Sequence, residues 1–148
     1  STGEDIAETY DTVSVESGGL TITKATRNPA LSGDWGFSSE GKPGDTIEYR
    51  ITFTNNGLYP LTSIVITDPL AYTLTLLQNC YSLGGSWGNV LLSFDGIDRL
   101  LVAEPGGDSN IDGAYLSETT LSIDITRVVG TLRPGSSGSF IFRTTIRE

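Results

Sequence analysis

The sequence contains no histidine, no methionine and only one cysteine, and this composition excludes several kinds of functional site. Without histidine, the chain lacks the commonest general base and the commonest metal ligand of proteins. The lone Cys80 cannot form an internal disulfide, which leaves a small buried apolar side chain or a cross-link between subunits. Because no start residue is present, we expect a processed mature form or a trimmed chain.

Basic residues and long apolar runs are also scarce. Nine lysines and arginines stand against 18 acidic residues, so the net charge is -9. Such a chain is unsuited to nucleic acid or anionic membranes, and no apolar run is long enough for membrane insertion. The sequence contains no phosphate-binding loop, histidine metal cluster or nucleophile elbow. We therefore expect a protein without catalytic residues or enzymatic activity.

Strand-forming segments separated by turns dominate what is present. Residues 46–54 alternate apolar and polar side chains, which is typical of a half-buried strand. No segment shows a helical period. Further strands are expected at residues 20–25, 63–67, 72–77, 119–126 and 139–146. In a chain of 148 residues, this pattern predicts one all-β, immunoglobulin-like β-sandwich.

The stretch at about 79–118 is less regular and rich in glycine. We expect an irregular elaboration on the sandwich there, with one or two additional strands such as residues 99–103. Four aromatic residues could form a sugar-stacking platform, although packing in the core or at a subunit interface is the favoured interpretation. These residues are Trp35, Tyr59, Tyr81 and Trp87.

Three segments carry a family resemblance. Residues 43–57 read PGDTIEYRITFTNNG, residues 64–70 read IVITDPL, and residues 130–140 read GTLRPGSSGSF. Together they resemble the opening signature, the next strand and the late turn of a conserved repeat in bacterial and archaeal surface proteins. That family is called domain of unknown function eleven. The resemblance covers about two thirds of the chain and implies an immunoglobulin-like fold without catalytic residues.

The resemblance also implies a shifted arrangement of strands. In tandem copies of the repeat, one more strand follows the segment that ends here at Glu148. A segment of that type instead precedes the domain, because residues 6–15 resemble the closing strand of a preceding copy. Residues 17–19 resemble the linker, and residues 20–24 resemble the first strand. We therefore expect a donor-strand arm at residues 1–17 and a sandwich at residues 18–148 that is incomplete by one strand.

We expect that this arm cannot close its own sandwich. The closing strand should end at one pole and the first strand should begin at the opposite pole, whereas a three-residue linker spans only about 10 Å. Open sheet edges recruit strands from other chains, as in chaperone–pilin complexes. The sequence therefore predicts a head-to-tail homopolymer of copies of this chain, because such contacts do not close.

Apolar residues of the arm are expected to plug an apolar groove. Since the arm does not follow one strict alternation, a bulge near residues 11–12 would be needed for all its apolar side chains to insert. The expected donor residues are Ile6, Tyr10, Val13 and Val15. The expected acceptor groove is lined by Phe140, Phe142 and Ile146.

A possible cation site lies at residues 108–113, which read D-x-N-x-D-G. Alternate oxygen side chains at this spacing, here Asp108, Asn110 and Asp112, can converge on one calcium ion because the glycine allows a sharp turn. A threonine, Thr119, occupies the position where an EF-hand has glutamate. A plain solvated turn therefore remains the alternative, and no other cofactor is expected.

Taken together, these features predict a secreted structural subunit of an extracellular or cell-surface filament, such as a pilus or matrix fibre. The alternative is a single repeat of a surface adhesin or S-layer-like protein that acts as a spacer or binding module.

Overall fold

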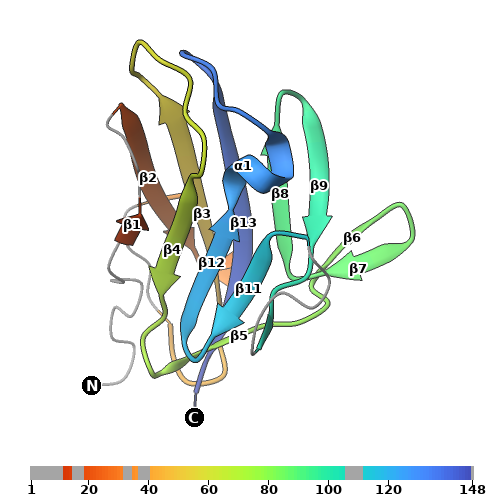
Figure 1. Cartoon of the computed structure of the whole chain (residues 1–148). Helices are drawn as coiled ribbons and strands as arrows, with labels where there is room; N and C mark the ends of the chain where they lie inside the picture. Colours follow the sequence, from red (N-terminus) through yellow and green to blue (C-terminus); the bar gives the residue numbers. More distant parts are fainter. Residues whose placement is uncertain (1–11, 15–18, 32–34, 37–40, 106–111, 148) are drawn as a thin grey trace.

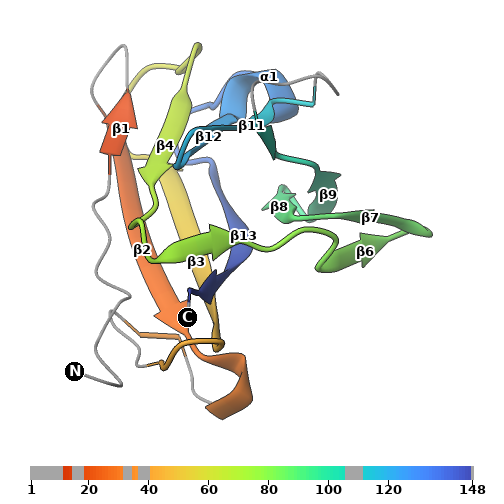
Figure 2. The same cartoon turned by 90° about the horizontal axis from the view of Figure 1, so that it is seen from below.

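Two antiparallel β-sheets packed face to face make up most of the protein, and a separate hairpin projects from one side (Figure 1). The computed structural model describes residues 12–14, 19–31, 35–36, 41–105 and 112–147. The view from below shows the two layers (Figure 2), and the buried apolar residues form one core cluster. The predicted all-β sandwich is therefore confirmed.

The first sheet has the strand order β2-β3-β13-β8-β9, and β5 pairs with the last residues of β13. Every pairing in it is antiparallel. Its strands are β2 (Leu20–Arg27), β3 (Thr46–Asn55), β13 (Ser137–Ile146), β8 (Val90–Phe94), β9 (Ile97–Leu101) and β5 (Leu74–Leu76).

The second sheet has the order β1-β4-β12-β11-β10, and only the β10–β11 pair is parallel. Its strands are β1 (Thr12–Ser14), β4 (Val65–Pro69), β12 (Thr120–Asp124), β11 (Ala114–Ser117) and β10 (Glu104–Pro105). The projecting hairpin consists of β6 (Tyr81–Leu83) and β7 (Ser86–Gly88). The remaining elements are a 3-10 turn, η1 (Pro29–Leu31), and a short helix, α1 (Ile125–Val129).

The core forms where β3 and β13 face β4 and β12. The alternation in β3 places Ile47, Tyr49, Ile51 and Phe53 inside, as expected, and all four are buried. The rings of Tyr49 and Phe142 are stacked with centroids 5.2 Å apart. Burial of such large apolar surfaces is the main favourable contribution to folding.

The strand expected over residues 119–126 is shorter in the structure. Strand β12 ends at Asp124, whose carboxylate accepts a hydrogen bond from the Arg127 N–H and caps helix α1. A side-chain oxygen at this position satisfies a backbone donor that the first helical turn leaves unpaired. Ile125 remains buried in the helix, so apolar alternation alone could not reveal where the strand ends.

Residues 79–118 hold more strands than the one or two expected. They include β6 to β11, and β8 pairs directly with β13, so part of this stretch completes the first sheet. Strands β8 and β9 are joined by Asp95 and Gly96, which have φ angles of 55° and 75°. Two such residues form the tight hairpin turn that suits the twist of antiparallel strands.

Replacing Phe142 with alanine should lower the free energy of unfolding by about 3–5 kcal/mol, because the change leaves a cavity beside Tyr49 and Phe140. Urea unfolding followed by tryptophan fluorescence measures the loss. Leu58→Ala is the matched control, since Leu58 is 85% exposed and should change stability by less than about 0.5 kcal/mol. Equal effects of both changes would contradict this assignment of the core.

Candidate functional site

The outer edge of β4 is the place where the sandwich takes up an additional strand. Strand β1 pairs with it antiparallel, and Thr12, Val13 and Ser14 lie opposite Thr67, Ile66 and Val65. We call residues Val65–Thr67 the acceptor edge. On its other side, β4 pairs with β12 over five residues, so β1 supplies the only other strand neighbour of β4 among the described residues.

Strand β1 belongs to the same chain, which contradicts the expectation that the arm cannot fold back. Ser14 lies opposite Val65, the first residue of β4, and Leu20 lies opposite Asn55, the last residue of β3. The loop between β3 and β4 joins these two points, so the closing strand and the first strand meet at one pole. The expected opposite-pole geometry is therefore wrong.

Distances explain how the chain can pass from β1 in one sheet to β2 in the other. Packed sheets lie roughly 10 Å apart, so the connection from β1 to β2 has only to cross from one layer to the other. The five steps from Ser14 to Gly19 can span about 17 Å when extended. The sandwich is thus supplied with its additional strand without any second molecule.

The expected donor residues are only partly within the described structure. Val13 is opposite Ile66 in the register, and Ile66 points into the core. The other three donor residues, Ile6, Tyr10 and Val15, lie outside the described residues, as does Asp11 of the expected bulge. Their insertion into an apolar groove remains a prediction.

The residues of the expected acceptor groove lie inside the closed fold, and their contact with a donor strand remains a prediction. Phe140, Phe142 and Ile146 lie on β13, which pairs with β3 on one side and with β8 and then β5 on the other. All three side chains are at most 5% exposed and belong to the core. The edge that takes up β1 is in the opposite sheet, on β4.

A buried ion pair joins the two sheets beside the acceptor edge. Lys24 on β2 places its Nζ 2.9 Å from Oδ1 and 2.8 Å from Oδ2 of Asp68, the β4 residue that follows Thr67. The Lys24 amine also lies 5.0 Å from the centroid of the Tyr49 ring. Sequence reasoning missed this pair, because only the packing of the sheets brings residues 44 positions apart together.

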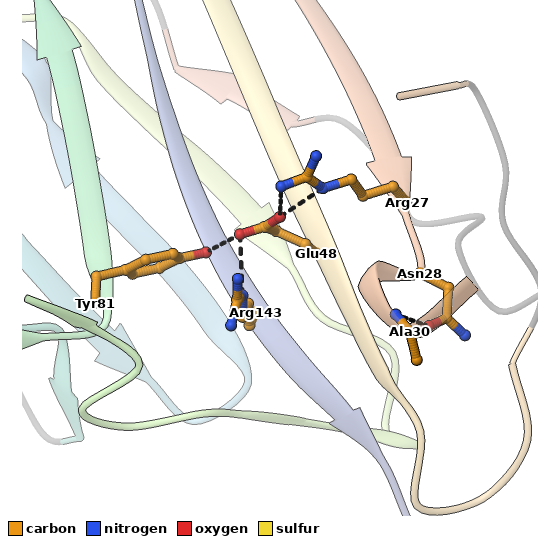
Figure 3. A network of polar contacts seen from close by, with 6 residues as sticks. All are labelled: Arg27, Asn28, Ala30, Glu48, Tyr81 and Arg143. Atoms are coloured by element: carbon orange, nitrogen blue, oxygen red, sulfur yellow. Dashed lines mark hydrogen bonds and ion pairs between the residues drawn. The ribbon is translucent and has the colours of Figure 1, made fainter. Parts of the chain in front are cut away.

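A second buried charge, Glu48, sits on the outer face of the first sheet (Figure 3). Its Oε1 accepts hydrogen bonds from Arg27, with Nε and Nη2 both at 2.7 Å. Its Oε2 accepts from the Tyr81 hydroxyl at 2.7 Å and from Nε of Arg143 at 3.0 Å. We call these four residues the Glu48 cluster. It fastens β6 to three neighbouring strands of the first sheet.

Electrostatics in the Glu48 cluster favour the ionised carboxylate. Burial raises the pKa of Glu48, but the hydrogen bonds from Tyr81, Arg143 and Arg27 outweigh it, so the net pKa is lowered. Burial and then the bond to Glu48 raise the pKa of the Tyr81 hydroxyl. Burial lowers the pKa of Arg143, but contact with Glu48 outweighs that effect and raises it. The cluster is thus a structural clamp with fixed protonation at neutral pH.

The aromatic residues proposed for a sugar platform do not share one surface. Tyr81 is buried in the Glu48 cluster, and Trp35 packs under Arg27 and Arg50, whose guanidinium carbons lie 4.4 and 4.7 Å from its ring. Tyr59 is exposed in the β3–β4 loop and Trp87 is exposed on β7. Figure 1 shows these last two elements well apart. The favoured interpretation of packing is confirmed for Tyr81.

Asp112 has a structural role that needs no cation. Its Oδ2 accepts a hydrogen bond from the Val102 N–H at 2.8 Å, and its Oδ1 accepts one from the Ala114 N–H at 3.0 Å. Asp108 and Asn110 lie outside the described residues. Among the residues the structure describes, no three His, Cys, Asp or Glu side chains cluster as metal ligands would. Calcium binding at residues 108–113 remains a prediction.

Cys80 is half-buried, and its Sγ approaches the carbonyl oxygen of Leu77 at 3.9 Å. Burial raises the pKa of its thiol, which disfavours the reactive thiolate.

Within the described part of the chain, no helix has the length and apolar character that crossing a bilayer requires.

No protein-family model and no curated protein matches the chain, so the resemblance to the surface-protein repeat depends on the three segments quoted above. Among solved structures, the chain is similar to the major pilin subunit BcpA of Bacillus cereus. A variant of that pilin aligns with a TM-score of 0.48 and 14% identity. A second structure of BcpA aligns with a TM-score of 0.45 and 16% identity. Each alignment covers 87% of this chain and 30% of the pilin chain.

Replacing Glu48 with glutamine should lower stability at pH 7 by about 3 kcal/mol, because two arginines lose their buried anionic partner. It should also flatten the pH dependence. Since the folded pKa of Glu48 is below its ordinary value of 4.5, its contribution is present above that value and is lost as the pH falls through the lowered pKa. Urea midpoints between pH 7 and pH 2 measure both effects. Identical acid slopes for Glu48→Gln and the exposed control Glu118→Gln would refute the clamp.

Calcium binding predicts a rise in the unfolding temperature on addition of calcium, because a ligand that binds only the folded state stabilises it. Differential scanning calorimetry with calcium and with magnesium provides the test. The rise should disappear in Asp108→Ala. A melting temperature unaffected by millimolar calcium would leave residues 108–113 as a solvated turn.

Proposed function

We propose that the chain is a non-enzymatic structural subunit of an extracellular filament, such as a pilus or matrix fibre, and that its N-terminal strand is exchanged between copies. In the assembled form, β1 of one copy lies on the acceptor edge of another. The observation that carries the proposal is that, among the described residues, the outer edge of β4 is paired only by the three residues of β1, close to the N-terminus.

The small size of the β1 contact supports exchange. Three residue pairs hold β1 on β4, whereas nine hold β13 on β3. Releasing β1 therefore disturbs little of the core, and pairing with a second copy restores the same backbone hydrogen bonds. Exchange of an identical element between copies is a low-cost route to assembly. An exposed β4 edge also recruits strands, which favours such exchange at high protein concentration.

The polarity of β1 limits the assemblies that exchange can produce. Donor and acceptor ends meet at one pole, so two copies that donate to each other form a closed dimer. A filament requires that each copy donates to one neighbour and accepts from another.

A second function, a monomeric surface spacer or binding module, is favoured by the pairing of β1 with its own β4. In that case the arm serves only to finish the sheet. The two functions differ in whether β1 stays in its own molecule.

A cysteine pair across the β1–β4 contact distinguishes them. Thr12 and Thr67 are opposite each other in the register, so Thr12→Cys/Thr67→Cys, made with Cys80→Ser, should oxidise across that contact. Strand exchange predicts a ladder of disulfide-linked oligomers on a non-reducing gel and filaments by negative-stain microscopy. Deleting residues 1–16 should abolish both.

Each single-cysteine variant in the Cys80→Ser background serves as the matched control and should give no ladder. If the double variant yields only an internally cross-linked monomer at all concentrations, the filament proposal fails and the spacer function stands. A single dimer band without higher species would point to reciprocal exchange and would also exclude a filament.

A further inference from the structure

Lys24 and Asp68 face each other inside the sandwich. Lys24 is on β2, the first strand of one sheet, and Asp68 is on β4 of the other sheet. Their side chains are 6% and 2% exposed, and the amine nitrogen lies 2.8 and 2.9 Å from the two carboxylate oxygens. The carboxyl carbon is bonded to both oxygens, so the nitrogen is held close to it.

The surroundings of this pair are apolar. On the same inner faces lie Ile22 of β2, Tyr49 of β3 and Ile66 of β4, which contribute to the core. Removing two opposite charges from water costs several kcal/mol per ion, which their mutual attraction has to offset. A neutral product that keeps the same side-chain geometry would not carry this desolvation cost.

We propose that the side chains of Lys24 and Asp68 condense to an isopeptide bond that ties the two sheets together. A proton first passes from the ammonium to the carboxylate, which gives a neutral amine and a neutral acid. The nitrogen lone pair then attacks the carboxyl carbon. The carboxyl hydroxyl leaves with the second nitrogen proton as one molecule of water, and an amide remains.

Proximity makes this condensation feasible without an added reagent. Atoms and electrons balance without an oxidant or a cofactor, because the amine and the acid together equal the amide and water. Reacting groups held at contact distance in a rigid frame behave as if present at very high concentration. Strand pairing on each side holds the frame, since β2 lies along β3 and β4 lies along β12.

The bond would close a covalent loop from β2 to β4. Pulling on the N-terminal end of β2 would then load a covalent link between the sheets in addition to hydrogen bonds. This inference does not depend on the proposed function, because Lys24 and Asp68 face each other whether or not β1 is exchanged.

Intact-mass spectrometry of the folded full-length protein tests the proposal. The expected mass is that of the sequence less one water molecule. Trypsin should fail to cleave after Lys24, and fragmentation should identify one branched peptide that joins Lys24 to Asp68. Lys24→Arg is the matched control, because a guanidinium keeps the ion pair but does not condense. That variant should have the full mass, should be cleaved after position 24, and should melt about 10 °C lower.

Three results would overturn the bond. The first is a wild-type protein with the unmodified mass and normal cleavage after Lys24, which leaves a plain ion pair. The second is loss of water that persists in Asp68→Ala, and the third is a branched peptide that joins Lys24 to another carboxyl group. Since the wild-type mass decides the first point, the test stands even if a variant fails to fold.

Discussion

Every β-strand carries backbone groups along both edges, and an inner strand is satisfied only when a neighbour lies on each side. In this protein β4 depends for its second neighbour on three residues that precede the domain in the sequence. The position of β1 therefore decides whether the outer edge of β4 is paired. In the proposed assembly, the same short pairing that completes the monomer would join one copy to the next.

Charged side chains inside the fold link elements that backbone strand pairing does not join. Lys24 and Asp68 link the two sheets beside the acceptor edge, and the Glu48 cluster links the projecting hairpin to the first sheet. Lys24, Asp68 and Glu48 are buried, and each is matched by an opposite charge, as low-dielectric surroundings require. The two features work differently, because the Glu48 cluster is built from fixed ionic hydrogen bonds whereas the Lys24–Asp68 pair contains groups able to condense.

Particular residues show how far the sequence could be interpreted. The alternation of Ile47 to Phe53 predicted both the strand and its buried face, because successive side chains of a strand point to opposite faces of the sheet. The same alternation assigned Glu48 to solvent, yet it is buried because β6 brings Tyr81 over it. The sequence likewise did not show that Phe140, Phe142 and Ile146 lie in the closed core. Their strand has neighbours on both sides that come from distant parts of the chain.

The sequence by itself determined the fold class and the main strands, and it showed the scarcity of catalytic side chains. These properties follow from local periodicity and composition, which each segment carries alone. Only the tertiary structure decided that the arm reaches its own β4, that both strand ends meet at one pole, and that Lys24 meets Asp68. Each of these depends on sheet order and on the spacing between layers, and neither quantity is encoded in a single segment.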